Sequence, residues 1–253
     1  MISRRGFACS IALILPLLGM SACDQPIDAG QFASFYEPYR FRLVINVETP
    51  DGPRVGSGVI EVRWSDSSFK VIGEAVPIDL PNGETLFVLL QSRGDVDWAS
   101  KSVTWIPEDL RKSWAMPKSE GGPPASERGK FFWHNVAAFR GTVPVPRTRK
   151  LPSSVVENYP LIVRFADAND PSTIAEVDPD KFSKSLGSGY SLVSIIATFT
   201  DAPVSTGIRK RLPWIDDYDR RDARLNGSTS VAIATNDLAD NLGAGAFSVG
   251  TPQ

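Results

Sequence analysis

The sequence predicts an α+β fold: a single domain rich in antiparallel β-strands, with a few short helices. The first observation is the regular alternation of apolar and polar residues over 39–48, which is the period of a half-buried strand. The second is that turn sequences rich in Pro, Asn, Asp and Gly separate the apolar runs at short intervals. The third is that helix signals are few and short. We therefore expect neighbouring strands joined as hairpins.

The first predicted hairpin joins the strand over 39–48 to a second apolar run over 59–64. The turn between them has a physical basis, because Pro50 fixes its own φ angle and Gly52 can adopt a positive one. The glycines of Gly56-Ser57-Gly58, just before the second run, indicate a β-bulge or an irregular start to that strand.

A second hairpin is predicted from the run 76–80 to the run 86–90. The sequence Asn82-Gly83 between them is the strongest short hairpin signal. Because residues 86–90 are apolar on both faces, this strand is expected at the centre of its sheet.

Three further strands are predicted over 161–165, 192–200 and 231–234. In the second of these, alternation predicts one shared face for the following residues: Val193, Ile195, Ala197 and Phe199.

Short helices are predicted over 107–114, 178–187 and 236–242. In the second helix Asp178 is the expected N-cap, and Gly187 lies just past the expected end. The Gly- and Pro-rich stretch 116–130 is predicted to be a mobile loop, after which Phe131-Phe132-Trp133 is expected to return to the core.

The first twenty-three residues have the pattern of an export signal. Arg4 and Arg5 form a positive start, residues 6–20 are uncharged and largely apolar, and small residues precede Cys23. The apolar run is short for a retained transmembrane helix, which needs about 20 residues, and no cationic cluster follows it.

This segment resembles the signal peptides of bacterial lipoproteins, which end in a lipobox. The resemblance implies cleavage between Ala22 and Cys23, with lipid such as palmitate attached to Cys23. The alternative is an ordinary secretory signal that is cut after Ala22 and leaves Cys23 as a free thiol. The pair Arg4 and Arg5 also resembles the twin-arginine export motif, so the Sec and twin-arginine routes both stay open. Separately, Asp24 resembles a signal that retains lipoproteins in the inner membrane.

The predicted organisation is a signal peptide over 1–22, a lipidated tether over 23–38 and one periplasm-facing domain over 39–253. Within that domain, 217–253 is expected to be a C-terminal extension of the same fold. The predicted location is the cell envelope, where the N-terminal lipid is expected to hold the protein on a membrane. Asp24 favours the inner membrane.

Composition excludes several function classes. The formal net charge of −2 becomes −4 without Arg4 and Arg5, which argues against nucleic acid as a partner. After removal of Cys9 with the signal, Cys23 is the sole cysteine, so no intrachain disulfide is expected. With one histidine, His134, the chain lacks the usual zinc-ligand combinations, and we expect neither a metal nor a cofactor.

Several spaced motifs resemble those of uncharacterised proteobacterial proteins of similar length, a family that implies one continuous domain and no known activity. The motifs that carry this resemblance are Glu48-Thr49-Pro50-Asp51-Gly52, Gly56-Ser57-Gly58, Val177-Asp178-Pro179, Leu186-Gly187-x-Gly189, Thr206-Gly207-Ile208, Leu212-Pro213-Trp214 and Asn236-Asp237-Leu238-Ala239.

Three patterns suggest chemistry, and each has a simpler structural interpretation. Ser67 and Lys70 have the Ser-x-x-Lys spacing of acyl-enzymes, but they follow a strand instead of opening a helix. His134 follows an aromatic run, which favours a packed or surface residue over a catalytic one. The aspartates between 216 and 222 lack the spacing of a calcium loop and have arginines beside them, which favours a surface charge cluster.

A partner surface is predicted where aromatic and cationic residues alternate, on Trp105, Trp114, Lys118 and Trp133. Such a surface suits an envelope protein or a glycan, whereas core packing is the structural alternative for the indoles. The predicted function is that of a cell-envelope lipoprotein that binds or scaffolds another component without catalysis. The alternative is a periplasmic hydrolase with an unrecognised carboxylate-based site.

Overall fold

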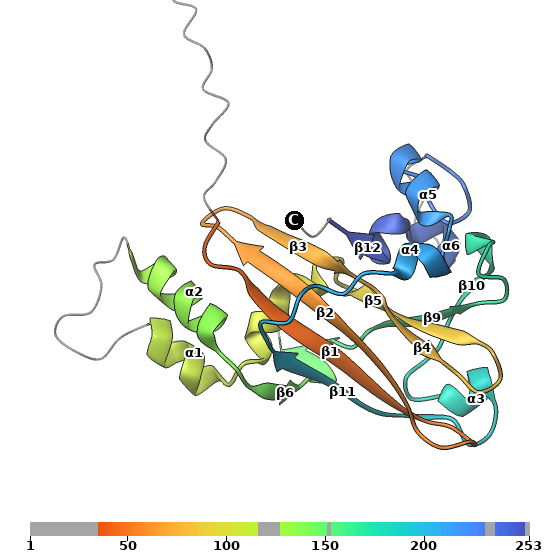
Figure 1. The fold of residues 1–253 in the computed structure, drawn as a ribbon, viewed down its shortest axis with the longest axis horizontal. Coiled ribbons are helices and arrows are strands. Elements are labelled where there is room, and N and C mark those ends of the chain that lie inside the picture. The colour runs from red at the N-terminus through yellow and green to blue at the C-terminus, as the bar shows by residue number, and fades with distance from the viewer. Residues whose placement is uncertain (1–34, 116–126, 151–152, 231–235, 251–253) are drawn as a thin grey trace, which may run out of the picture. The chain divides into compact units, whose positions relative to one another are not determined.

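The computed structural model describes residues 35–115, 127–150, 153–230 and 236–250 (Figure 1). They belong to one compact unit, Ala33–Gln253. No helix within these ranges is long and apolar enough to cross a membrane.

The larger sheet has six strands in the order β12-β3-β2-β1-β11-β6, and all its neighbours are antiparallel. Its strands are β1 (Tyr39–Glu48), β2 (Arg54–Trp64), β3 (Phe69–Glu74), β6 (Thr142–Pro144), β11 (Ser191–Phe199) and β12 (Ser248–Val249). On β1 every second side chain from Tyr39 to Val47 is buried, which confirms the alternation predicted for this strand.

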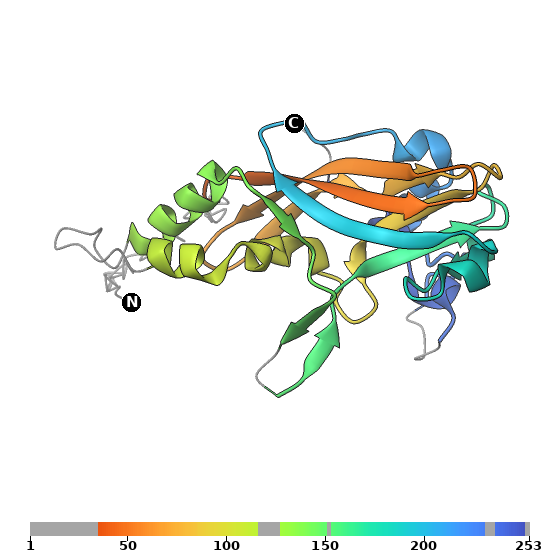
Figure 2. The same cartoon turned by 90° about the horizontal axis from the view of Figure 1, so that it is seen from below.

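The smaller sheet has four antiparallel strands in the order β10-β9-β5-β4. Its strands are β4 (Val76–Asp79), β5 (Thr85–Ser92), β9 (Pro160–Phe165) and β10 (Ile174–Glu176). The hairpin of β4 and β5 turns at Gly83, whose φ of +85° favours glycine. A separate ribbon, β7 (Thr148–Lys150) with β8 (Val155–Glu157), projects from the domain in Figure 2.

The helices are short. The α-helices are α1 (Glu108–Ala115), α2 (Arg128–Ala138), α3 (Phe182–Leu186), α4 (Ile208–Arg211), α5 (Ile215–Arg221) and α6 (Leu238–Asn241), and the 3₁₀ segments are η1 (Trp98–Trp105), η3 (Pro171–Thr173) and η4 (Ala244–Ala246). Together with the antiparallel sheets they confirm the predicted α+β class.

Strand β5 separates two hydrophobic cores, and this explains why it is apolar on both faces. Leu86 and Val88 pack in the first core, between the two sheets and beside η1 and α2. Phe87 and Leu89 pack in the second core, against the C-terminal helices. Leu225 and several other residues of the predicted C-terminal extension are buried there, so this segment helps to cover the smaller sheet.

The prediction of a bulge at Gly56 and Gly58 is wrong. Strand β2 begins at Arg54 and pairs with β1 in regular register through both glycines. The glycines instead let the smaller sheet approach, since a Cβ at Gly56 would lie 2.5 Å from Cγ1 of Ile78 and 2.8 Å from the carbonyl oxygen of Pro77. Close backbone approach is the other common reason for glycine in a strand.

The register irregularity occurs between β1 and β11, at Asn46 and Val47. Because of this register shift, the buried face of β11 differs from the predicted one at one position. Ile195, Ala197 and Phe199 are buried as expected, but Val193 is 61% exposed, and Leu192 packs against the first core in its place.

Helix α2 was not predicted, and helix α3 begins later than predicted. Helix α2 begins at Arg128, so residues 128–130 are helical rather than part of a loop, and the rest of that predicted loop, 116–126, lies outside the described residues. Helix α3 begins at Phe182, because Asp178 accepts a hydrogen bond from the amide of Asp180 in a preceding turn. The strand predicted over 231–234 also lies outside the described ranges.

Candidate ligand-binding groove

One residue of the predicted partner surface, Trp105, is buried in the core, whereas Trp114 and Trp133 both contact Phe132. Trp105 is 7% exposed, and it packs edge-on against Phe41 with ring centroids 5.5 Å apart. Its ring therefore has no free face for a partner, and core packing is the correct interpretation for this indole. Lys118 lies outside the described residues.

Trp114 and Trp133 are half-buried on α1 and α2. The Trp133 ring stacks on Trp64, with centroids 5.2 Å apart, and on Tyr36, with centroids 6.3 Å apart. Trp114 contacts Phe132 and Phe139. Both indoles thus pack within the domain and keep a partly exposed edge.

The residues of the predicted export signal, Arg4, Arg5, Ala22 and Cys23, lie outside the described ranges. The end of the predicted tether is described, and it is bound to the domain. The amide of Tyr36 donates to the carbonyl oxygen of Trp64 at 2.7 Å, and the Tyr36 hydroxyl donates to Asp66. Tyr36, within the segment predicted as tether, therefore contacts the domain.

For the patterns that suggest chemistry, the structure agrees with the simpler structural interpretations. Ser67 lies in the turn before β3, and Lys70 lies on that strand, so the Ser-x-x-Lys spacing does not open a helix. His134 is exposed, with Nδ1 at 2.8 Å from Glu37. Within the described part of the chain, no group of three or more His, Cys, Asp or Glu side chains could hold a metal ion.

The aspartates after Trp214 form a surface charge cluster with arginines. Asp216 pairs with Arg209, and Asp217 pairs with Arg220 and Arg221 on the same helix, α5. Asp216 and Asp217 thus form ion pairs at the surface, as expected for a surface charge cluster.

Among the residues that the structure describes, four carboxyl groups have lowered pKa values. Burial acts to raise the pKa of Glu61, but ion pairs with Arg63 and Arg40 outweigh it and lower that pKa. The pKa is lowered for Asp79 by hydrogen bonds from Arg211, for Glu108 by a bond from Lys112, and for Asp178 chiefly by the amide of Asp180. A carboxylic acid that donates a proton near neutral pH needs the opposite shift, so none of these four suits that role.

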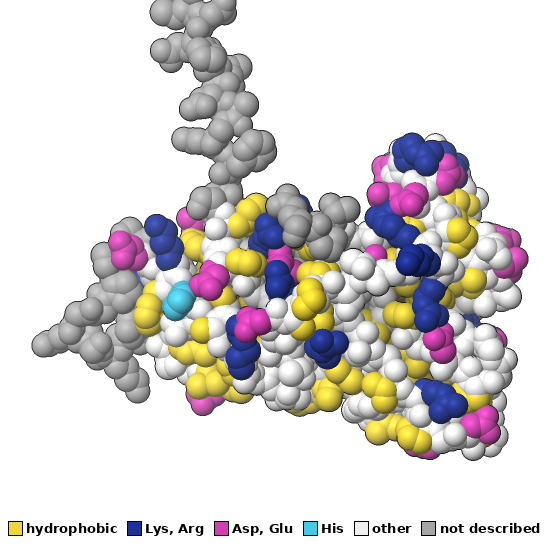
Figure 3. Space-filling view, in the orientation of Figure 1, with side chains coloured by type: hydrophobic (Ala, Val, Ile, Leu, Met, Phe, Trp, Pro, Cys, Tyr) yellow, Lys and Arg dark blue, Asp and Glu magenta, His cyan; other side chains and the backbone are white. Residues whose placement is uncertain are grey.

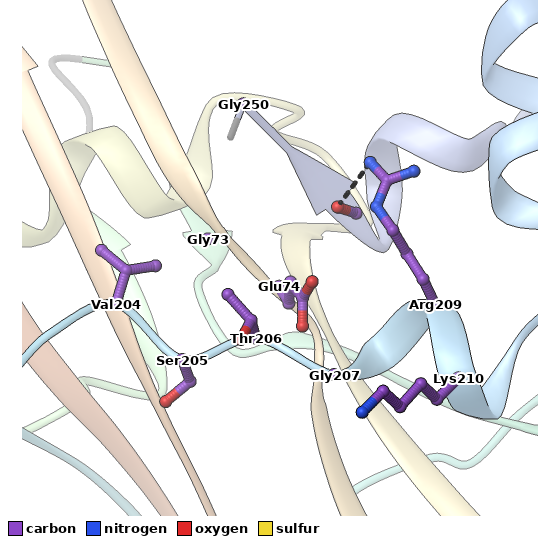
Figure 4. A pocket seen from close by; sticks show the side chains of 10 residues that line it. Gly73, Glu74, Val204, Ser205, Thr206, Gly207, Arg209, Lys210 and Gly250 are labelled. Carbon is purple, nitrogen blue, oxygen red and sulfur yellow. Dashed lines mark hydrogen bonds between the residues drawn. The ribbon is translucent and has the colours of Figure 1, made fainter. Parts of the chain in front are cut away.

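A groove of about 350 Å³ opens beside the end of β3 (Figure 4). Such a volume falls within the usual range of small-molecule sites, roughly 300–1,000 Å³. Four segments that are distant in sequence line it: Gly73 and Glu74 of β3, residues 204–207, Arg209 and Lys210 of α4, and Ser248 with Gly250 at β12.

One wall of the groove belongs to the connection from β11 to α4, residues 200–207, which passes across β1 and β2 in Figure 1. Ser205 fixes its far end beside β2, because its amide donates to the carbonyl oxygen of Val59 at 3.1 Å and its Oγ accepts from the Val59 amide at 3.0 Å. Gly207 then turns with a φ of +134°, which favours glycine and sends the chain into α4.

Glu74 holds α4 against the sheet. Its Oε2 accepts a hydrogen bond from the backbone amide of Ile208 at 2.8 Å. Ile208 itself is buried in the second core. This bond joins the end of β3 to the first turn of α4. Glu74 also belongs to the lining of the groove.

The cations of the groove differ in their partners. Arg209 pairs with Asp216, and its Nη2 donates to Oγ of Ser248 at 3.3 Å. Lys210 is exposed and has no ion pair or hydrogen bond with any side chain that the structure describes. Figure 3 shows Lys and Arg side chains gathered over α4 and α5 on this face.

Sequence patterns indicated only part of this site. Thr206-Gly207-Ile208 is one of the spaced motifs, and the structure assigns it to the groove wall and the start of α4. Glu74 and Ser248 had no local signal, because their role depends on the pairing of β3 with β12.

Comparison with known proteins gives no match: neither a family model, nor a curated protein, nor a solved structure is similar to this chain at a significant level.

Proposed function

We propose that this chain is a cell-envelope lipoprotein, anchored by lipid on Cys23 and facing the periplasm, whose domain binds a ligand in the groove beside β3 without catalysing a reaction. The observation that carries the binding role is the groove itself. It has the volume of a ligand site, and its Lys210 ammonium has no partner among the described side chains.

The lipid anchor rests on the sequence of residues 1–23. A tether from Cys23 to Phe35 spans at most about 45 Å at 3.3–3.6 Å per residue, so the domain would stay close to the membrane that holds the lipid. Tyr36, whose amide donates to the carbonyl oxygen of Trp64 and whose ring stacks on Trp133, is where such a tether would join the domain.

The lowered pKa values of Glu61, Asp79, Glu108 and Asp178 make these four carboxyl groups unsuitable as the proton donor of a hydrolase. A carboxylate-based hydrolase needs one carboxyl group that keeps its proton near neutral pH. Each of these four instead has partners that stabilise the charged form.

Site-specific photocrosslinking in intact cells tests the binding role. A photoreactive residue replaces Thr206, which is exposed at the groove, and in a matched control it replaces Ser183, which is exposed on α3. We expect an adduct at position 206 and none at 183, with its mass measured on the purified protein. Equal adducts at both positions, or none at 206, would argue against the groove as the binding site.

A further inference from the structure

The chemistry of the groove limits what it can bind. Glu74 uses Oε2 to accept from the amide of Ile208, while Oε1 has no hydrogen-bond partner among the described residues. Lys210 brings an ammonium to the same groove, and the two side chains form no ion pair with each other. The groove therefore offers one anionic and one cationic group at separate places.

The remaining charge in the groove is already balanced. Arg209 pairs with Asp216 and donates to Ser248, so its guanidinium is held by protein groups. In Figure 4 the Arg209 side chain extends away from Lys210, and the dashed line marks its hydrogen bond to Ser248. The charges left for a ligand are thus the carboxylate of Glu74 and the ammonium of Lys210.

A ligand with a single charge would meet one like charge in this groove. A simple anion that pairs with Lys210 would share the groove with the carboxylate of Glu74, and a simple cation that pairs with Glu74 would share it with the ammonium of Lys210. A small molecule that carries both an ammonium and a carboxylate satisfies the two groups together. Val204 adds an apolar wall, and the hydroxyl of Thr206 adds a hydrogen-bonding group.

We propose that the groove binds a small zwitterion, an amino acid or a short peptide, with its ammonium on Glu74 and its carboxylate on Lys210. This assignment rests on the proposed binding function of the same groove. Because both groups are partly exposed to water, the pairs contribute modestly, and the affinity is expected to be in the millimolar range, about −4 kcal/mol.

Calorimetry on the full chain purified in detergent tests this assignment with three probes: the dipeptide alanyl-alanine, its N-acetyl form and its C-terminal amide. Acetylation removes the ammonium, and amidation removes the carboxylate. We expect the free dipeptide to bind about threefold to fivefold more tightly than either blocked form, a difference of about 0.6–1 kcal/mol.

Two variants identify the group that recognises each end. Glu74→Gln keeps an oxygen that can accept from Ile208, and it should abolish the preference for the free dipeptide over the N-acetyl form. Lys210→Met should abolish the preference for the free dipeptide over the C-terminal amide. The matched controls are Glu48→Gln and Lys184→Met, at exposed positions outside the groove, and both should bind as the wild type does. Melting temperatures measured in parallel show whether each variant is folded.

The zwitterion assignment is overturned if the three probes bind equally, if the control variants lose as much affinity as the groove variants, or if no probe binds more tightly than about 10 mM. If the probes fail while the residue at position 206 still captures a ligand in cells, the groove remains the binding site and the ligand class is wrong. If both fail, the proposed function fails as well.

Discussion

The indole of Trp133 stacks on the phenol of Tyr36, with ring centroids 6.3 Å apart and an angle of 20° between the planes. Tyr36 lies in the segment predicted as tether, and Trp133 lies on α2, so this contact holds the N-terminal segment on the domain. Gly129 makes room for it, since a Cβ there would lie 2.8 Å from the Tyr36 hydroxyl oxygen. The domain therefore includes Tyr36, a few residues before the predicted boundary at Tyr39.

Trp133→Ala should lower the free energy of unfolding by about 2–3 kcal/mol, because it removes a half-buried ring that stacks on Tyr36, Tyr39 and Trp64. It should also speed protease cleavage near Phe35. Denaturant unfolding and limited proteolysis measure the two effects. Leu110→Ala, on the exposed helix α1, is the control and should change neither by much. An unchanged cleavage rate in Trp133→Ala would show that the stack does not hold the tether.

Gly56→Ala should destabilise the domain by about 2 kcal/mol or more. The new methyl group would meet Ile78 and the backbone oxygen of Pro77, so β4 must move away from β2. Thermal unfolding checks this, with Gly94→Ala as the control, because a Cβ at Gly94 meets no atom within 4 Å. Equal melting temperatures for the two variants would contradict close packing of the sheets at Gly56.

Glu61→Gln should cost about 2 kcal/mol near neutral pH, since Glu61 is 2% exposed and its carboxylate pairs with Arg40 and Arg63. The effect depends on pH in a defined direction. The folded pKa of Glu61 lies below its ordinary value of 4.5, so the charged carboxylate stabilises the fold above that pH, and the stabilisation is lost as pH falls below it.

Urea unfolding of the wild type and the Glu61→Gln variant, at pH 7 and at successive lower pH values, measures this dependence. The difference in unfolding free energy should be full at pH 7 and shrink as pH falls below about 4.5. Glu48→Gln, at the exposed end of β1, is the control. A difference that grows on acidification would contradict a lowered pKa for Glu61.

Local patterns in the sequence predicted much of the fold. The alternation in β1, the Asn82-Gly83 turn and the apolar run in β5 each depend on neighbours within a few residues, and each prediction is confirmed. The errors arise where distant segments meet. Gly56 is required by the approach of Ile78, and Val193 is turned outward by a register shift against Asn46. Neither relationship has a signature in the adjacent sequence.

The groove could not be predicted for the same reason. Glu74, Thr206 and Ser248 lie in three distant parts of the chain and meet only because β12 pairs with β3 while residues 200–207 cross the sheet. Conversely, the aromatic and cationic residues around Trp105 in the sequence predict a partner surface, yet tertiary packing buries Trp105 beside Phe41 and Trp98. Aromatic residues near cations indicate a surface only when the fold leaves them exposed.

The proposed lipid on Cys23 would hold the domain at a membrane and so define the compartment in which the groove meets a ligand. The most direct test labels growing cells with a palmitate analogue and compares the wild type with Cys23→Ser after fractionation. We predict that the wild type carries the label and sediments with membranes, whereas Cys23→Ser is unlabelled and is either unprocessed or soluble. A Cys23→Ser protein that is cut after Ala22 and still held in the membrane fraction would contradict a lipid anchor on Cys23.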